Sequence, residues 1–347
     1  MPDSGLNQSD RADQAVYVAE AYFDSKNYER ARDVLRQSLS QHPTDPVLLA
    51  QHARAEYLLD NLPAAASSAY AALSVAPQDE MAMRIYTLSL DGLGRYYDSM
   101  WMAWRTVVTH PNEPLPHRLY ARLLQKWRQF PVALLAVDEA LRLAPTDVDA
   151  LVLRGSILND LGRIAESDAA YRQALSLDPG NAEALNNMAV NRMQRGRFQH
   201  ALRGFLGAAG LDPALGDLAR RNIGVVLRRV LRFVTIAAAI LGFLVALAAG
   251  LQHGGHPTAT LRVAAGLLTA ALIFVLARVG RIIPRPVLAS VLREQVFVTL
   301  RLVHALVAVV AGAWVTVSPW STPMLPVGVM LAISGLVLFR IGSFIGR

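Results

Sequence analysis

Residues 151–179, LVLRGSILNDLGRIAESDAAYRQALSLDP, end on a proline that belongs to a series with a fixed step. Six prolines follow one another at intervals of 34 residues, namely Pro43, Pro77, Pro111, Pro145, Pro179 and Pro213. A period of this length is typical of repeat arrays, in which each repeat is one supersecondary unit stacked on its neighbours. The series therefore predicts six repeats of equal length before about residue 215.

Other columns of the repeat are equally regular. With the proline numbered position 32, positions 8, 20 and 27 carry small residues in every repeat, such as Gly155, Ser167 and Ala174. Position 17 is large and apolar throughout, with Tyr28, Leu62, Tyr96, Phe130, Ile164 and Phe198. Small residues let two helices approach closely and large ones fill the space beside them, so each repeat is predicted to be an antiparallel helix pair.

With these columns the chain resembles the tetratricopeptide repeat (TPR) family. Its best single repeat carries Leu151, Gly155, Leu158, Gly162, Tyr171, Ala174 and Pro179 at the signature positions. No repeat has the tryptophan that the family has at position 4. The resemblance implies an all-α superhelical solenoid of six repeats with a concave groove lined by first helices. The predicted repeats are 12–45, 46–79, 80–113, 114–147, 148–181 and 182–215.

The predicted helix ends carry suitable residues. Gly94, Gly162 and Gly196 fall at position 15, where the end of the first helix favours a residue that tolerates positive φ. Pro63 and Pro131 fall just inside second helices, where a missing N–H costs nothing. Asp45, Asp79, Asp147 and Asn181 are expected to cap the helices that follow them.

Charge is divided unevenly along the chain. Residues 1–215 hold 21 basic and 25 acidic residues, and residues 216–347 hold 13 and 2. The net charge of +7 therefore belongs to the second part and does not by itself indicate a nucleic-acid partner. The absence of cysteine excludes disulfides and thiolate nucleophiles. Lys26 and Lys126 are the only lysines, an arginine bias that favours a bacterial source.

Two short segments flank the repeats. Residues 1–11 are polar, have no apolar run and are expected to be disordered rather than to form a signal peptide. Residues 216–232 are expected to form a capping and juxtamembrane helix. Its apolar residues would cover the last repeat, namely Leu218, Ile223, Val226, Leu227 and Val230. Its arginines would face water, namely Arg220, Arg221, Arg228, Arg229 and Arg232.

Residues 233–347 are predicted to form a four-helix transmembrane domain. The predicted spans are about 233–251, 261–279, 302–320 and 324–342. The first has no charged residue over 19 positions, enough to cross a bilayer. The fourth is short, and an alternative joins the last two spans into a re-entrant pair around Pro319, Pro323 and Pro326. Residues 284–301 read as an interfacial amphipathic helix that would attract anionic lipid without specificity.

The loops indicate an orientation. Arginines precede the first span and occur in the 280–301 connection and at the C-terminus. The loops after the first and third spans have none. By the positive-inside rule, the TPR domain and both termini are predicted to be cytoplasmic, in a multi-pass protein of the cytoplasmic (inner) membrane. Trp320 is then expected at the outer interface. Arg262 and Arg278 are expected to snorkel from the ends of the second span.

The groove supplies the candidate binding residues. Family positions facing it include Arg54, Arg84, Arg118, Arg122 and Lys126, which could hold an acidic protein or peptide partner through charge-assisted hydrogen bonds. The alternative is a solvated helix face whose charges pair with Glu56, Glu80 or Asp91. Asn186 and Asn187 lie on the groove side and could bond an extended peptide, or form ordinary polar surface.

Chemistry-bearing motifs are sparse. The HGGH run of His253 and His256 has too few further ligands for a metal site, and a tight turn explains it. His304 falls within the third span, but no acidic residue or lysine occurs in any span to act as its relay partner. We find no phosphate loop, no dinucleotide fingerprint and no nucleophile–histidine–acid pattern, so the sequence predicts no enzyme, no catalytic residue, no metal and no cofactor.

Small residues recur every four positions in the first span, from Ala238 through Gly242 and Ala246 to Gly250. Such ridges predict close helix packing within the bundle, or alternatively contact with a membrane-protein partner or a second copy. The function predicted is that of a membrane-anchored cytoplasmic adaptor or scaffold that binds a protein partner. The alternative is a subunit of a transport, secretion or envelope-assembly complex in which the transmembrane domain is the working part.

Overall fold

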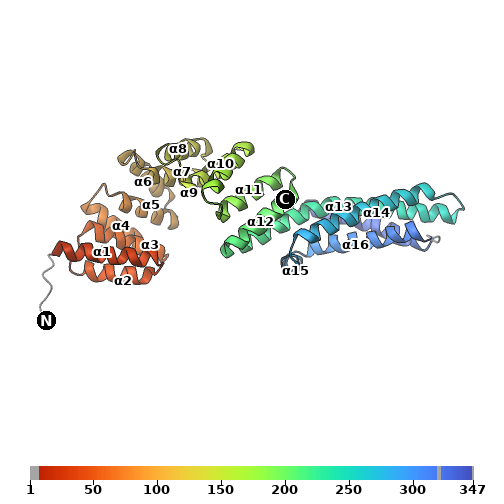
Figure 1. Cartoon of the computed structure of the whole chain (residues 1–347), viewed down its shortest axis with the longest axis horizontal. Helices are drawn as coiled ribbons and strands as arrows, with labels where there is room; N and C mark the ends of the chain where they lie inside the picture. Colours follow the sequence, from red (N-terminus) through yellow and green to blue (C-terminus); the bar gives the residue numbers. More distant parts are fainter. Residues whose placement is uncertain (1–7, 319–321, 346–347) are drawn as a thin grey trace. The chain divides into compact units, whose positions relative to one another are not determined.

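The described part of the chain is helical throughout, which confirms the predicted all-α class (Figure 1). This computed structural model describes the backbone of residues 8–318 and 322–345, and the side chains of residues 12–318 and 323–341. The chain divides into two compact units, Met1–Gln173 and Ala174–Arg347.

The first unit is a series of antiparallel helix pairs. Its helices are α1 (Gln8–Asp24), α2 (Tyr28–Leu39), α3 (Pro46–Leu58), α4 (Leu62–Val75), α5 (Glu80–Gly92), α6 (Tyr96–Thr109), α7 (Pro114–Lys126), α8 (Phe130–Leu143) and α9 (Val148–Asp160). The next helix, α10 (Ile164–Leu177), begins in the first unit and ends in the second. From α1 to α9 each helix contacts the next, and α1, α3, α5, α7 and α9 also contact one another in turn. The first helices of successive repeats therefore line one common face.

The start of α1 differs from the prediction. The helix begins at Gln8, so residues 8–11, which we expected to be disordered, are helical. A helix that is already stabilised by packing from Ala12 onward can extend by a turn at little cost, because propagation adds one hydrogen bond per residue. Residues 1–7 lie outside the described part of the chain.

Position 15 of the repeat has a left-handed backbone in every repeat. Gly94, Gly162 and Gly196 have φ of 76°, 74° and 72°. The equivalent residues in the other repeats are not glycine, but Lys26, Asp60 and Arg128 have φ of 56°, 60° and 60°. The predicted helix end is therefore confirmed at the three glycines, and three side chains adopt it against their steric preference.

The predicted caps and small columns also hold. Asp45, Asp79, Asp147 and Asn181 each accept a hydrogen bond from a backbone N–H in the first turn of the next helix. At position 8 of the fifth repeat, a Cβ on Gly155 would lie 2.5 Å from Cε1 of the buried Tyr171 ring. The small residue is thus needed for the aromatic side chain to pack against α9.

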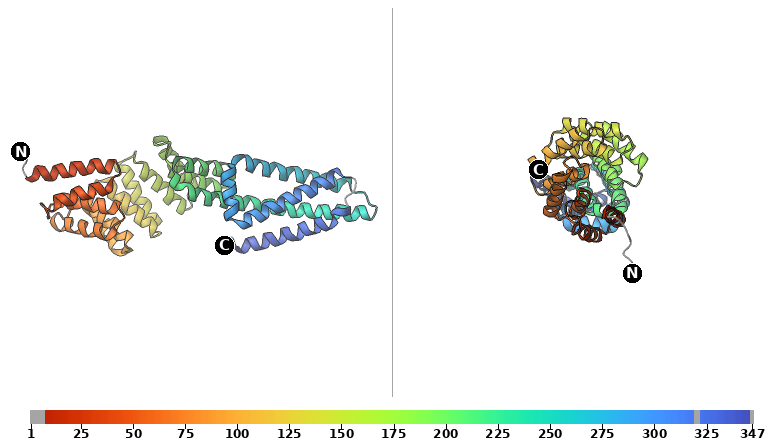
Figure 2. Two further views of the ribbon diagram at one scale, coloured as in Figure 1. Left: turned by 90° about the horizontal axis from the view of Figure 1, so that it is seen from below. Right: turned by 90° about the vertical axis from the view of Figure 1, so that its left-hand side faces the viewer.

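The second unit joins the last repeat to a bundle of long helices. It contains α11 (Ala182–Gln194), α12 (Phe198–Leu211), a 3-10 turn η1 (Pro213–Leu215), α13 (Gly216–His253), α14 (Ala259–Ile282), α15 (Arg285–Glu294), α16 (Val296–Val317), η2 (Thr322–Met324) and α17 (Leu325–Ile345). The four long helices run alongside one another, and α13 contacts α14, α16 and α17 (Figure 2).

The segment after the repeats and the first predicted span form one helix. α13 runs for 38 residues without interruption. Ile223, Val226 and Leu227 are buried in a core shared with Leu202 and Phe205 of the last repeat. The five arginines predicted to face water are all exposed, namely Arg220, Arg221, Arg228, Arg229 and Arg232.

Three helices, α13, α14 and α16, are long and apolar enough to cross a membrane by length and composition. The fourth predicted span falls in α17, whose apolar stretch Leu325–Ile341 is shorter. A four-span topology therefore stays a prediction. Trp320 lies outside the described residues.

The connection before α16 differs from the predicted single helix over 284–301. It breaks at Gln295, which has an extended backbone (φ −121°, ψ 80°), and α16 begins at Val296 rather than Leu302. Arg301, counted above among the loop arginines, is therefore inside α16 and 4% exposed. Its guanidinium is accommodated there because backbone carbonyls accept its hydrogen bonds.

The predicted small-residue ridge packs α13 against α17. A Cβ on Gly328 would lie 2.5 Å from the backbone nitrogen of Ala246 and 2.6 Å from the carbonyl oxygen of Gly242. A Cβ on Gly242 would in turn meet the backbone nitrogen of Ala332 at 2.9 Å. Packing within the bundle is thus confirmed as one use of the ridge, because the two backbones touch here.

Candidate partner-binding groove

The face lined by the first helices carries the predicted cations of the first unit, and most are held by intramolecular ion pairs. Arg54 of α3 donates from Nη1 to Glu20 of α1, at 2.8 Å to Oε1 and 3.0 Å to Oε2. Its guanidinium also lies over the Phe23 ring, 4.1 Å from the centroid. Arg54 is therefore fixed by charge and by a cation–π contact between the first two repeats.

The ion pair of Arg84 lies within one helix, whereas the ion pairs of Arg118 join two repeats. Arg84 pairs within its own helix, with Nε donating to Glu80 at 3.0 Å. Arg118 of α7 donates to Asp147 at 2.7 Å and to Asp149 at 3.0 Å. Because Asp147 also caps α9, Arg118 holds two repeats together and has little charge left for a partner.

The fourth repeat supplies the remaining two cations. Lys126 of α7 donates to Asp91 of α5 at 2.7 Å and lies 5.0 Å from the centre of the Tyr96 ring. Arg122, one turn earlier on the same helix, is exposed and makes no ion pair with any described residue. It is the groove cation whose charge is available.

Arg122 acts electrostatically across the groove. Burial raises the pKa of the Tyr57 hydroxyl on α3, Asp91 adds to that increase, and Arg122 opposes it. The tyrosine therefore stays protonated and can donate or accept a hydrogen bond in the groove.

A pocket opens beside these residues. It has a volume of about 290 Å³, and its walls include Phe23, Arg54, Tyr57, Arg84 and Leu88. The apolar walls can accept the apolar stem of a partner side chain. The two guanidinium groups can accept its hydrogen-bonding or acidic end. The structure thus brings Arg54 and Arg84 to one pocket, while Arg118 serves the contact between repeats.

The two asparagines of the last repeat are placed differently. Asn186 is 4% exposed, its amide nitrogen donates to Asn187 at 3.2 Å, and its oxygen accepts from Asn222 of α13 at 3.2 Å. Both ends of Asn186 are thus used inside the second unit. Asn187 lines a separate pocket of about 550 Å³ next to the cap.

Three exposed aromatic residues and a valine form a stripe on α6 that we did not predict from the sequence. Tyr97, Trp101, Trp104 and Val108 are 80%, 55%, 50% and 58% exposed. They recur at intervals of four, three and four residues, so they share one face of the helix. The sequence contained a signal for this exposure. The position that Trp101 occupies carries Asp33 in the first repeat and Ser67 in the second, as expected of a solvent-facing position.

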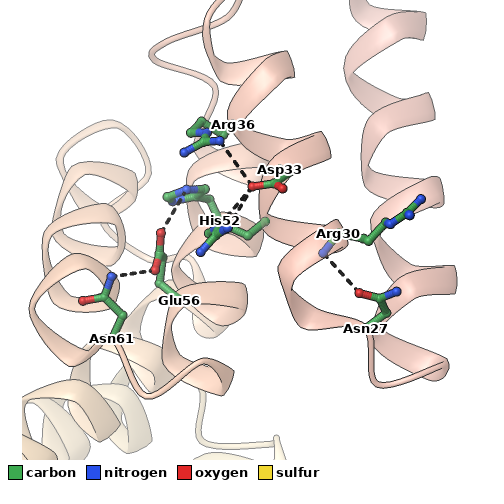
Figure 3. A network of polar contacts seen from close by, with 8 residues as sticks. Asn27, Arg30, Asp33, Arg36, His52, Glu56 and Asn61 are labelled. Atoms are coloured by element: carbon green, nitrogen blue, oxygen red, sulfur yellow. Dashed lines mark hydrogen bonds and ion pairs between the residues drawn. The ribbon is translucent and has the colours of Figure 1, made fainter.

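A histidine network links α3 and α4 within the second repeat. The His52 ring contacts the Ser68 hydroxyl from Nδ1 at 3.0 Å. Its Nε2 lies 3.6 Å from Glu56, which also accepts from Asn61 at 2.9 Å (Figure 3). The order serine, histidine, acid occurs in hydrolases, but the histidine–carboxylate distance is too long for a hydrogen bond. Burial lowers the pKa of His52, although Glu56 opposes the shift. We interpret the network as a structural link between the two helices.

The described residues contain no group of three histidine, aspartate or glutamate side chains placed to hold a metal ion.

In the second unit, Arg301 donates to the carbonyls of Arg228 and Leu338, and His304 contacts the Leu331 carbonyl at 3.0 Å. These two side chains therefore tie α16 to α13 and α17.

Comparison with known proteins agrees with the repeat architecture. Residues 12–55 and 148–181 match models of the tetratricopeptide repeat. No curated protein matches the chain. Among solved structures, the chain is similar to PilW, a type IV pilus biogenesis factor, with a TM-score of 0.53 and 19% identity over 60% of this chain and 96% of that chain. It is also similar to pilF of Pseudomonas aeruginosa, with a TM-score of 0.51 and 15% identity over 59% and 94%. At such identities the likeness concerns the fold alone.

Proposed function

Because the chain is a tetratricopeptide repeat protein, we propose that it is a non-enzymatic scaffold that binds a protein segment in the groove of its first helices. The fold supports a protein or peptide partner, as TPR folds typically do. We further propose that the helices after the repeats anchor it in the bacterial cytoplasmic membrane. The repeats and both termini would then face the cytoplasm, in keeping with the distribution of arginines.

The observation that carries the groove proposal is the combination of the pocket beside Arg54 and Arg84 with the unpaired Arg122. The charges of Arg54 and Arg84 are paired with glutamates, and those of Arg118 and Lys126 with aspartates. We therefore propose a partner segment with one apolar side chain for the pocket and an acidic group near Arg122, rather than a uniformly acidic tail. Fork-shaped guanidinium donors suit a carboxylate in this position.

The test places a photo-crosslinking amino acid at Leu88, a wall of the pocket, in the full chain in its native membranes. We expect an adduct that falls at least about tenfold in the double variant Arg84→Glu/Arg122→Glu, since both charges would then repel an acidic group. The control is Arg142→Glu on α8, which breaks an exposed pair with Glu139 of small energetic value. Equal adduct yields in all three proteins would overturn the groove proposal.

A second candidate function is a subunit of a membrane assembly whose working part is the helix bundle. The observation that favours it is the buried pair of Arg301 and His304 in α16, since ionisable groups among apolar helices are retained mainly for function or packing. Capture of the same integral membrane proteins by the wild type and the double variant would favour this candidate.

A further inference from the structure

Two adjoining pockets in the second unit form one groove between the last repeat and the first two long helices. The larger, of about 400 Å³, lies between α12, α13 and α14. The smaller, of about 240 Å³, lies along the same helices further into the bundle. Phe198, Val230 and Val275 line both, so the two pockets adjoin. We call this the α12–α14 groove.

One end of the α12–α14 groove is basic. Arg197 just before α12, His200 of α12 and Arg278 of α14 line it, and no acidic residue does. Arg278 donates from Nη2 to the amide oxygen of Gln199 at 2.7 Å, which holds the guanidinium across the mouth of the groove. A guanidinium has five N–H donors, so most of them stay available to a ligand.

The other end is apolar. Its lining includes Phe233, Ala237, Leu268 and Ala271, and every residue of that pocket is apolar. The change falls where α13 passes from Arg228, Arg229 and Arg232 into the uncharged run that begins at Phe233. The groove therefore crosses from a charged level into an apolar level along its length.

We propose that the α12–α14 groove binds an anionic phospholipid. The phosphate would contact Arg197 and Arg278, and one acyl chain would lie along Phe233 and Leu268. Charge complementarity selects the headgroup, because the mouth has cations and no acid to balance them. The apolar end excludes a free phosphate or an acidic peptide as the natural occupant, since neither would cover that surface. The proposal rests on the proposed membrane location and extends it from general attraction to a defined site.

The test uses the full-length protein in detergent and counts bound lipid by native mass spectrometry. Phosphatidylglycerol and phosphatidylcholine with identical chains are added in turn. We expect phosphatidylglycerol to be retained preferentially, and Arg278→Gln to weaken its binding about fivefold. Arg281→Gln is the matched control, because Arg281 is exposed on the same helix and does not line the groove.

A second pair of variants tests the apolar end. Ala271→Trp should fill it and reduce phosphatidylglycerol binding, whereas Ala270→Trp, exposed and outside the groove, should not. Equal binding of both lipids, or equal effects within either pair of variants, overturns the site while leaving the membrane location intact. Absence of bound lipid of any kind overturns the site together with the proposed membrane location. The groove test with the Leu88 crosslinker is independent of both.

Discussion

Arg128 adopts a backbone conformation that the repeat geometry requires but that is unfavourable for a residue with a side chain. It occupies position 15 with φ of 60°, where three other repeats have glycine. A side chain in this left-handed conformation costs about 1 kcal/mol or more. Glycine is thus the residue that the repeat geometry favours, and Arg128 is a local weak point of the fourth repeat.

Replacement Arg128→Gly should raise the free energy of unfolding by about 1 kcal/mol, since it removes this steric cost. The measurement is a denaturant titration of the detergent-solubilised protein followed by circular dichroism. Ala136→Gly is the control, because Ala136 lies inside α8 with helical backbone and glycine there should lower stability by about 1 kcal/mol. A stabilisation shared by both variants would contradict the explanation.

His52 makes the first unit sensitive to acid. Burial lowers its pKa below the ordinary 6.5, so the unfolded chain binds a proton more readily than the folded one. Stability from this group is fully present above pH 6.5 and is lost as the pH falls toward the depressed folded value. We expect His52→Gln to flatten the fall in unfolding free energy between pH 7 and pH 5. A slope unchanged by His52→Gln would contradict this role of the histidine.

Some contacts of the groove residues could be predicted from the sequence, whereas those within the helix bundle could not. Glu20 and Arg54 stand one repeat apart at the same position, so their contact follows from the period. The burial of Arg301 did not follow, because its acceptors are carbonyls on two helices far along the chain. Sequence periodicity predicts neighbours in a regular repeat but does not predict which backbone groups face one another in a bundle.

At the scale of the elements, the backbones of α13 and α17 touch at Gly328. We expect Gly328→Ala to destabilise the bundle by about 1–3 kcal/mol, since the new methyl group would overlap backbone atoms of Gly242 and Ala246. The control Gly250→Ala adds a methyl on the same ridge of α13, where the nearest atom is 3.9 Å away, and should be neutral. Denaturation in mixed micelles measures both. A neutral Gly328→Ala would mean that α17 separates easily from α13.

Helix boundaries were predictable where local chemistry sets them. Asp79 and Asn181 cap helices, and Gly162 ends one, as the repeat pattern indicated. The break at Gln295 was missed because no proline or glycine marks it. There the extended backbone depends on packing, including the approach of the Gln295 side chain to Gly224 of α13.

At the scale of the whole molecule, the membrane topology is directly testable because the chain has no cysteine. Single cysteines can be placed at Ser67, His256 and Ala289, all exposed. In intact cells a membrane-impermeant maleimide should label His256→Cys, in the loop after α13. Ser67→Cys and Ala289→Cys should react only after the membrane is opened. Labelling of Ser67→Cys and Ala289→Cys but not of His256→Cys in intact cells would reverse the proposed orientation.

The unbroken α13 also has a mechanical consequence. Its N-terminal part shares a core with the last repeat, and its C-terminal part packs against α14, α16 and α17. No flexible hinge separates the two, and 38 residues of α-helix span about 57 Å. A force on the sixth repeat is therefore transmitted along this uninterrupted helix to the far end of the bundle. Under the proposed membrane location and partner binding, such a force would reach the membrane-embedded helices as tilt or torque.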